Sequence, residues 1–533
     1  MTKILENRED TSCNSPWWKK VIAWGGKNWF YITLFLLAAI GVPCAFFIPP
    51  RIPGLKDDGN TVVSLRQGIL AVLAGALTML TLWETHRKNT HEKDKNERDH
   101  VRQVHAERRS RYTTAVEQLA NEKAAVRLGG IYTLVGLVDE WLADDSLAED
   151  KQQEEGQVII NNLCSYIRSP FPLAAKFEEY EARKELEKLQ KSGSEKLSEE
   201  ESSRLQVLLK RFEDSDEYEK PKDITTDYAK FHEEQDVRRA IFEEMSKRSS
   251  TLTRDEKDDV FKTVPGRWSH FQLDFSRAPV FYPLSNLTIE KGNFSSAKFY
   301  CDASFMSAVF AQQANFRSAV FAQKADFRSA VFVQTADFMR ATFAQKADFT
   351  GTVFTQSAIF SWATFTQTAD FRSAIFTQSA LFSWATFTQT AGFMRATFTQ
   401  TADFMRATFA QTADFKSATF AQTTDFKSAT FARTTDFRRA KFTKFEPTFA
   451  ARMRKAQFSA GANRQDYKFQ VASKNKPIEL GTATLLGKPF EIPVGTVLFD
   501  PDSWDEQKKK YTQFSAPAKP LDNSDKAEEN KAE

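Results

Sequence analysis

The feature that most constrains this chain is a ladder of phenylalanines in its C-terminal half. From Phe294 to Phe442, 28 Phe follow one another at steps that alternate between five and six residues. Ala stands two residues before nearly every Phe, and one eleven-residue unit reads ADFRSAVFVQT (325–335). A long repeat at a fixed period indicates stacked repeats rather than an ordinary globular domain.

An α-helix does not fit this ladder. A period of 11 is compatible with a right-handed coiled coil, but a step of five residues turns an α-helix by about 140° beyond one full turn. Successive Phe would then point to different faces. In a strand alternate residues share a face, so the Ala and Phe of each Ala-x-Phe both point inward. The remaining two or three residues turn the corner, which predicts a β-solenoid.

The units resemble those of the pentapeptide-repeat family, whose unit is written A-(D/N)-L-x-x. Ala325-Asp326-Phe327 and Ala402-Asp403-Phe404 match it with Phe at the central place. The resemblance implies a right-handed, four-sided β-helix, which we expect over 268–445. The central residue of each unit would fill the core, with the small residue packed beside it. The extra residue in every second unit departs from the plain pattern and leaves the corner geometry open.

The register of the ladder defines the expected core, and each buried Phe contributes about 1.5–3 kcal/mol before entropy. The first twelve core residues are Phe294, Phe299, Phe305, Phe310, Phe316, Phe321, Phe327, Phe332, Phe338, Phe343, Phe349 and Phe354. Four sides per coil predict seven coils, or about 34 Å of rod at about 4.8 Å per layer. Gln recurs in the units from Gln312 to Gln422, which predicts side-chain amide ladders along two corners.

Two apolar stretches near the N-terminus predict a membrane hairpin. Residues 29–48 carry no charge and residues 62–83 carry only Arg66. Each stretch has about the length that a helix needs to cross the hydrocarbon core. Gly68, Ala71 and Gly75 are expected to let the two helices approach closely. A pair of buried core helices or a signal peptide fits these lengths and flanks less well.

Basic residues predict the orientation of the hairpin, because they concentrate on the cytoplasmic side. They precede the first span and follow the second, while the connector pairs its two bases with acids: Lys19, Lys20, Lys27; Arg87, Lys88, Lys93, Lys95; Arg51, Lys56, Asp57, Asp58. We therefore expect a multi-pass protein of the cell membrane. Its N-terminal segment (1–28) and everything after the second span would lie in the cytoplasm.

Residues 84–267 are expected to form a charged helical linker. Residues 174–212 predict two helices around a Ser-Gly turn at 192–194, as a self-contained hairpin or a partner-binding coiled coil. EQLANEKAAVRLGGIYTL (117–134) resembles a helical segment that often lies between a membrane anchor and the repeats in bacterial pentapeptide-repeat proteins. DVRRAIFEEMSKR (236–248) resembles the helix that often precedes such an array.

The C-terminal part is expected to close the solenoid. Phe445, Phe449 and Phe458 break the step, so the array is expected to end there. A cap over 446–513 would contain short strands, because ELGTATLLGKPFEIPVGTVLFD (479–500) alternates as two or three strands do. These strands would pair with the last coil or form a separate lid, and 514–533 would be disordered. The expected fold is therefore a multidomain α+β chain.

No catalytic pattern stands out in the sequence. It contains no phosphate loop, no HExxH, no GxSxG and no dinucleotide fingerprint. The four Cys share no close spacing, which argues against a Cys-based zinc site. We assign no catalytic, cofactor-binding or metal residue and expect no cofactor.

The net charge of the repeat array distinguishes between the remaining candidate functions. From 294 to 442 there are 15 Lys or Arg and 9 Asp or Glu, whereas family members that imitate DNA and bind topoisomerases need an acidic rod. Nucleic-acid binding is not favoured, because the bases recur singly and the Phe point inward. The leading hypothesis is a non-catalytic, membrane-anchored scaffold that presents the solenoid to a protein partner. The alternatives are a modulator of a topoisomerase-type enzyme and an enzyme with its site in the helical part or the lid. The oligomeric state stays open.

Overall fold

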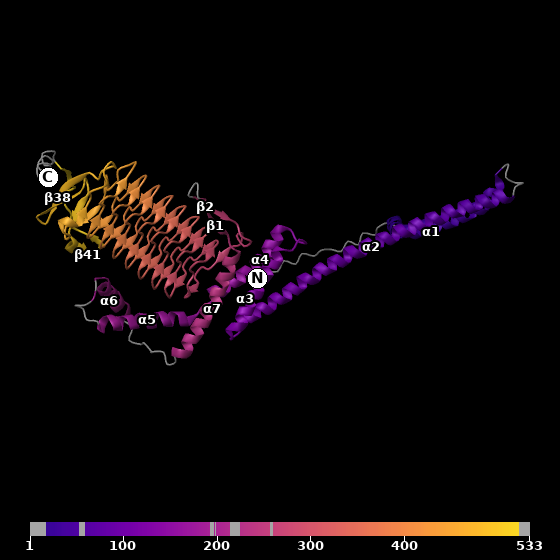
Figure 1. Ribbon diagram of the computed structural model, residues 1–533, viewed down its shortest axis with the longest axis horizontal. Helices are drawn as coiled ribbons and strands as arrows, with labels where there is room; N and C mark the ends of the chain where they lie inside the picture. The colour runs from indigo at the N-terminus through magenta and orange to yellow at the C-terminus, as the bar shows by residue number, and fades with distance from the viewer. Residues whose placement is uncertain are drawn as a thin grey trace. The chain divides into compact units, whose positions relative to one another are not determined.

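The computed structural model describes residues 17–52, 59–191, 197, 199–213, 224–255 and 260–521. The chain divides into two compact units, residues 1–109 and 110–533. Helices come first, a parallel β-solenoid follows, and short strands close the chain (Figure 1). This order confirms the expected fold class.

The first unit contains two apolar helices. They are α1 (Trp17–Phe47) and α2 (Gly59–Leu119), with the short 3-10 helix η1 (Pro49–Arg51) between them; the last turns of α2 belong to the second unit. Both helices include a stretch that is long and apolar enough to cross a membrane, and almost none of those residues is buried. Lys56, Asp57, Asp58 and residues 1–16 of the expected N-terminal segment lie outside the described residues.

The close contact between α1 and α2 occurs at a glycine that the sequence did not single out. A Cβ on Gly41 would lie 2.5 Å from the side chain of Leu73, so a larger residue there would displace that side chain. Gly68 and Gly75 have no such neighbour within 4 Å. The expectation that these two glycines mediate the approach is therefore wrong.

The second unit begins with a set of packed helices. They are the end of α2, α3 (Ala124–Leu142), α4 (Glu149–Arg168), α5 (Pro172–Lys191), α6 (Glu199–Phe212) and α7 (Ile224–Arg248). Helices α5 and α6 share a small apolar cluster centred on Ala182, Leu189 and Leu208. The turn expected at 192–194 lies outside the described residues. Strands β1 (Thr251–Asp255) and β2 (Val260–Val264) then pair antiparallel.

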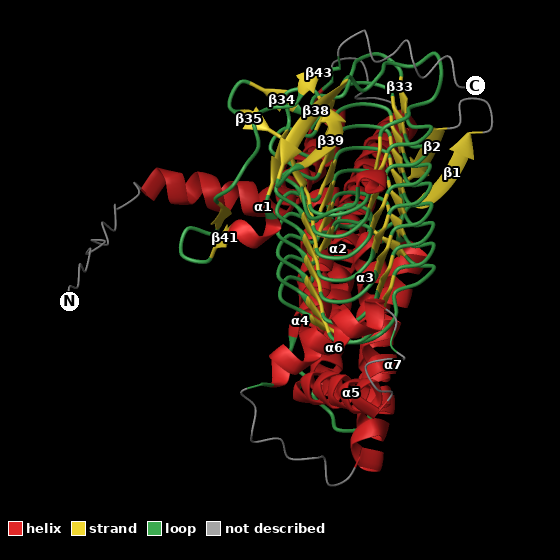
Figure 2. Cartoon of the chain, turned by 90° about the vertical axis from the view of Figure 1, so that its left-hand side faces the viewer, coloured by secondary structure: helices red, strands yellow, loops and turns green. Residues whose placement is uncertain are grey.

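The solenoid has four faces, each a parallel sheet of two-residue strands (Figure 2). Face 1 contains β3 (Leu273–Asp274), β6 (Gly292–Asn293), β10 (Ala314–Asn315), β14 (Ala336–Asp337), β18 (Ala358–Ile359), β22 (Ala380–Leu381), β26 (Ala402–Asp403) and β30 (Thr424–Asp425). Face 2 contains β4 (Pro279–Val280), β7 (Lys298–Phe299), β11 (Val320–Phe321), β15 (Thr342–Phe343), β19 (Thr364–Phe365), β23 (Thr386–Phe387), β27 (Thr408–Phe409), β31 (Thr430–Phe431), β36 (Gln457–Ser459) and β40 (Val497–Phe499).

The other two faces lie opposite these. Face 3 contains β8 (Ala303–Ser304), β12 (Ala325–Asp326), β16 (Ala347–Asp348), β20 (Ala369–Asp370), β24 (Ala391–Gly392), β28 (Ala413–Asp414), β32 (Thr435–Asp436) and β37 (Tyr467–Lys468). Face 4 contains β5 (Thr288–Ile289), β9 (Val309–Phe310), β13 (Val331–Phe332), β17 (Val353–Phe354), β21 (Ile375–Phe376), β25 (Thr397–Phe398), β29 (Thr419–Phe420) and β33 (Lys441–Phe442).

Each sheet has at least eight strands, so the solenoid has about eight coils. The expectation of seven coils is one too few. The ladder was counted from Phe294, but the first coil uses other apolar residues in the same places, among them Val280, Leu284 and Ile289. Strand partners throughout the array are 22 residues apart, as Phe321 and Phe343 are.

The phenylalanine rings form four columns, one behind each face. Within the array, rings in one column lie 4.4–5.1 Å apart and tilt by at most 10°. Rings of opposite columns meet edge to face, as Phe327 and Phe338 do at 5.5 Å and 87°. All twelve core phenylalanines named above are at most 1% exposed. The interior is therefore filled with aromatic rings and the small Ala side chains beside them.

The six-residue steps place their extra residue at every second corner. The corners between faces 1 and 2 and between faces 3 and 4 have two residues, and the other two corners have three, with Gln in the middle. An amide contact of the ladder predicted for Gln occurs where Gln345 donates to Gln323. Threonine hydroxyls supply a further ladder: Thr377 Oγ1 donates to the Thr355 carbonyl at 2.7 Å, and Thr399 Oγ1 to that of Thr377 at 2.6 Å.

Helix α7 covers the N-terminal end of the solenoid. The Phe242 ring lies 4.6 Å from Phe275 and 6.3 Å from Phe294 between ring centroids, so it continues the aromatic core into the helices. The Thr288 amide donates to Ser246 Oγ at 2.8 Å. These contacts join the helical region and the solenoid in one apolar core.

The ring columns continue beyond residue 445. Phe449, Phe458 and Phe469 stack on Phe426, Phe431 and Phe437 at 5.0, 4.9 and 6.0 Å, although their spacing is irregular. The longer steps hold inserted segments: β34 (Ala450–Ala451), β35 (Arg454–Lys455) and the 3-10 helix η2 (Arg464–Asp466).

The C-terminal strands both pair with the solenoid and extend beyond it. Strand β40 pairs with β36 in the last layer of face 2. The remaining elements are β38 (Leu480–Leu485), β39 (Lys488–Pro493) and β43 (Lys519–Pro520) in one sheet, then η3 (Pro501–Ser503), and β41 (Trp504–Asp505) paired with β42 (Lys510–Tyr511). β43 falls within the expected tail 514–533, whose residues 522–533 lie outside the described ones. Covering the last coil protects an open sheet edge from pairing with other chains.

Truncating one central ring tests the importance of the columns. Phe376→Ala is expected to lower the unfolding free energy by about 3–5 kcal/mol, because its ring stacks on both sides and the rigid coil cannot close the cavity. Phe445→Ala is the matched control, since Phe445 is 47% exposed; it should change stability by about 0.5 kcal/mol or less. Urea unfolding of both variants measures the difference, and equal midpoints would contradict the stacked core.

Candidate functional site

The two-residue corners are where the solenoid surface departs most from its repeat. At the corner between faces 1 and 2, the second residue of every coil has a positive φ. Along the column these residues are Arg277, Ser296, Ser318, Arg340, Trp362, Trp384, Arg406 and Ser428, with φ between 56° and 63°. Positive φ is unfavourable for a bulky side chain, so two adjacent Trp here are unusual.

The two tryptophans form an exposed stack. Their rings lie 4.5 Å apart with an angle of 8° between them, and they are 48% and 36% exposed. The guanidinium carbon of Arg406 lies 4.2 Å from the centre of the Trp384 ring, which is a cation–π contact. Arg340, the preceding residue of the column, is also exposed.

The same two coils are altered on face 1. Ile359 and Leu381, which pair across β18 and β22, stand where the coils on either side carry Asp337 and Asp403. We call Ile359, Trp362, Leu381 and Trp384 the tryptophan patch. It is an apolar centre with charged residues around it, the composition typical of the core and rim of a protein interface.

Sequence reasoning missed this patch. It treated the aromatic residues available for stacking as few, because it followed only the inward-pointing Phe. The signal was present in AIFSWATF (358–365) and ALFSWATF (380–387), two near-identical segments one coil apart that depart from the repeat at the same two places. The predicted Phe residues, in contrast, all lie inside and cannot touch a partner.

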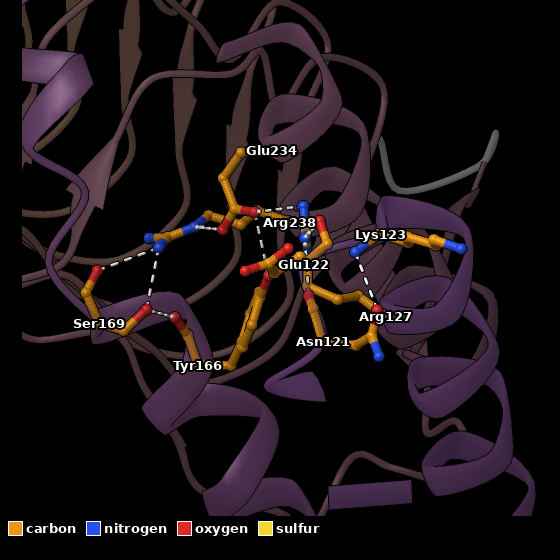
Figure 3. Close-up of polar contacts among 8 residues, drawn as sticks. All are labelled: Asn121, Glu122, Lys123, Arg127, Tyr166, Ser169, Glu234 and Arg238. Atoms are coloured by element: carbon orange, nitrogen blue, oxygen red, sulfur yellow. Dashed lines mark hydrogen bonds and ion pairs between the residues drawn. The ribbon is translucent and has the colours of Figure 1, made fainter. Parts of the chain in front are cut away.

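A buried polar network joins α7 to α3, to α4 and to the break between α2 and α3 (Figure 3). Glu234 on α7 lies at its centre: its carboxylate accepts hydrogen bonds from Arg238 Nε at 2.7 Å, Tyr166 Oη at 3.1 Å and Arg127 Nη2 at 3.2 Å. Arg127 also donates to the Asn121 and Glu122 carbonyls at 2.9 and 2.7 Å. The break between α2 and α3 is thereby held against α7.

Arg238 is 1% exposed and fully occupied. Besides Glu234 it donates to the Ile167 carbonyl at 2.9 Å and to Ser169 Oγ at 2.9 Å. Its guanidinium also lies 5.3 Å from the ring centre of Phe281 in the first coil. Because each guanidinium nitrogen has a hydrogen-bond partner, the site is suited to holding elements together rather than to chemistry.

The pKa values of the helical region agree with a structural role. Burial raises the pKa of the Cys164 thiol to about 12, and burial together with the Glu234 charge raises that of Tyr166. Neither group is poised for acid–base work near neutral pH. Within the described ranges, no group of three or more His, Cys, Asp or Glu is arranged to hold a metal ion.

Comparison with known families concerns the middle of the solenoid. Residues 307–353 and 340–383 match the model of pentapeptide repeats (9 copies). Searches of curated proteins and of solved structures each return no match to the chain. The match includes Trp362 and ends one residue before Trp384, so the first tryptophan of the patch is a variation on that repeat.

Removing the central arginine tests the network. Arg238→Ala is expected to destabilise the chain by about 3–5 kcal/mol, because it leaves the buried Glu234 carboxylate without its closest cation. The neighbouring Arg239→Ala is the control; Arg239 is 36% exposed and pairs with Glu243 at 2.7 Å, and such surface pairs contribute about 0–1 kcal/mol. Urea unfolding followed by tryptophan fluorescence compares them, and equal losses would contradict a special role for Arg238.

Two aspartates in one column of face 3 are expected to respond to pH in opposite ways. Burial alone raises the pKa of Asp326, but hydrogen bonds from Arg328 and its charge outweigh burial and leave that pKa below normal. Burial, together with the Asp436 charge, raises the pKa of Asp414. The ionised form of Asp326 is thus stabilised by folding, and that of Asp414 is destabilised.

At pH 7, Asp326→Asn should therefore lower stability and Asp414→Asn should raise it. The contribution of Asp326 is present above the unfolded-state pKa of about 3.9 and is lost as pH falls through its lower folded-state pKa. The penalty at Asp414 likewise disappears in acid. Unfolding midpoints at pH 7 and in acid measure both variants, and shifts of the same sign at pH 7 would contradict this assignment.

Proposed function

Because its solenoid is built of pentapeptide repeats, we propose that this chain is a membrane-anchored, non-catalytic scaffold that binds a protein partner through the tryptophan patch. Pentapeptide-repeat solenoids are typically interaction scaffolds, and the comparison found no catalytic family. The observation that carries the proposal is the pair of exposed, stacked Trp at positive φ. The positive φ is shared by every coil at this corner, so what distinguishes these two coils is the exposed aromatic pair itself.

The rigid core makes the patch a preformed binding surface. The corner residues rest on coils whose rings are stacked on both sides, so binding costs little ordering of the backbone. Trp and Arg are the residues most enriched among those that dominate binding energy, and they act best when an apolar centre excludes water. The partner that fits is a surface with apolar side chains and carboxylates that reach Arg340 and Arg406.

Membrane anchoring rests on the first unit. The apolar stretches of α1 and α2 expose almost all their side chains, as expected of helices whose surroundings are lipid. The basic residues on both outer flanks favour a cytoplasmic location for the solenoid. Protease added to inverted membrane vesicles should then cleave the solenoid region, and protection of that region would contradict the orientation.

Restoring the repeat consensus at the patch tests the proposal. In the variant I359D/W362S/L381D/W384S every new residue is one that another coil of the solenoid already carries at the same position, as Asp337 and Ser318 do, so the fold should be retained and its thermal midpoint unchanged or higher. A photo-crosslinking amino acid in place of Ser361 should yield a partner adduct in membranes with the native patch. We expect the adduct to fall at least tenfold in the consensus variant.

Arg395→Ser, at the equivalent position of the opposite two-residue corner, is the matched control and should leave the adduct unchanged. Equal adducts from the native and consensus chains would rule out the patch as the binding surface. Loss of the adduct only when the whole array is deleted would contradict it in the same way. Recovery of a topoisomerase as the adduct would favour the alternative, modulation of a DNA-processing enzyme.

A further inference from the structure

A separate cavity lies where the helical region meets the first coils of the solenoid. Its volume is about 280 Å³, and it lies between helix α5, helix α7 and the corner that joins faces 2 and 3. These elements are labelled beside the start of the solenoid in Figure 1. Binding pockets for small ligands begin at about 300 Å³, so the space suits a group of few heavy atoms.

Aromatic rings make up much of the wall. The four aromatic lining residues come from three elements: Phe177 on α5, Tyr228 and Phe231 on α7, and Tyr300 on the solenoid corner. Phe177 packs against Tyr228 and Phe231 with centroid distances of 4.5 and 4.8 Å. Lys298 already places its ammonium 4.5 Å from the centre of the Tyr300 ring. A cation on one of these rings is therefore a contact that the structure itself uses.

Carboxylates complete the wall. Glu178, Glu181 and Asp302 line the cavity, and Cys301 and Gln323 are its other lining residues. Arg211 neutralises Glu178 through two hydrogen bonds of 2.6 and 2.7 Å. Glu181 accepts a hydrogen bond from Tyr228 Oη at 3.1 Å, which orients its carboxylate toward the aromatic wall. Lys184 Nζ lies 3.9 Å from Glu181 Oε1 on the outer side of the same helix, where both side chains are exposed. No Lys or Arg is among the lining residues, so the wall of the cavity carries carboxylates and no cation.

The electrostatic environment of Cys301 is consistent with carboxylates in the cavity wall. Burial raises the pKa of its thiol to about 12, and the charges of Asp302, Glu178 and Glu181 raise it further. The thiol is therefore neutral and contributes an apolar surface to the cavity. The carboxylates of Glu178 and Glu181 on α5 and of Asp302 on the solenoid corner thus all affect the buried Cys301 thiol.

We propose that this cavity binds a small organic cation of the alkylammonium class, such as a trimethylammonium compound or a short diamine. Aromatic faces attract a cation through their negative quadrupole, and carboxylates at the rim supply the opposite charge. A metal ion is not favoured, because the described residues contain no group of three or more His, Cys, Asp or Glu arranged to hold one. An anion is excluded by the carboxylates. The proposal does not depend on the function of the tryptophan patch.

Occupancy would also affect the helices. Helix α5 contacts the solenoid beside this cavity, and its partner α6 reaches the same place through the ion pair of Arg211 with Glu178. A ligand held between α5, α7 and the corner would therefore tighten the attachment of the α5–α6 pair.

Calorimetric titration of the full chain in maltoside detergent tests the proposal. Choline, tetramethylammonium and putrescine are the probes, and 3,3-dimethylbutan-1-ol is the neutral compound with the shape of choline. We expect saturable binding of at least one cation and binding of the neutral compound at least tenfold weaker than that of choline. No saturable cation binding, or equal binding of choline and its neutral counterpart, would overturn the proposal.

The double variant E181Q/D302N keeps the shape of the cavity and removes its charge, so cation affinity should fall by about tenfold or more. Glu187→Gln is the matched control on the same helix, since Glu187 is 69% exposed and does not line the cavity. Tyr300→Leu should weaken binding while leaving the neighbouring coils paired. An unchanged affinity in E181Q/D302N at an unchanged thermal midpoint would also overturn the proposal.

Discussion

Stacking of one phenylalanine on another, one coil further along, is the interaction on which the rest of the structure depends. Each coil must be 22 residues long for its rings to coincide with those of its neighbours, and the backbone hydrogen bonds between coils follow from that length. The corners and the outward-facing residues of the strands are then the places where the chain can vary without disturbing the core. Strain, exposed aromatic rings and charge all occur there, because the interior admits none of them.

The sequence was sufficient to predict the solenoid because the pattern of Phe and Ala excludes a helix and requires a fixed coil length. It was insufficient at both ends. The first coil uses Leu, Val and Ile in place of part of the ladder, and the last coil spaces Phe449, Phe458 and Phe469 irregularly around inserted segments. Periodicity in the sequence reveals only Phe residues at identical spacing. Ring stacking requires only that each ring lie over the ring of the preceding coil, whatever the number of residues between them.

The candidate sites were harder to predict than the fold. The tryptophan patch is visible in the sequence only as two small departures from a strong repeat, and the departures matter only once their common corner is known. The cavity beside α5 gave no sequence signal, because Phe177, Tyr228 and Tyr300 are far apart in the chain and belong to three different elements. The network of Glu234 and Arg238 was missed for a different reason. Charged residues in a helix are usually solvated, so nothing in the sequence marked these two as buried.

The alternation of corners has a consequence for how such a rod can change in evolution. One eleven-residue unit covers half a coil, and the two halves present equivalent rings to the core. Loss or gain of a single unit would preserve the interior yet rotate every downstream surface residue by half a turn about the axis. Loss of two units would restore the original phase and merely shorten the rod. Whether Trp362 and Trp384 face the same side as the C-terminal strands therefore depends on whether an odd or an even number of eleven-residue units is gained or lost between them.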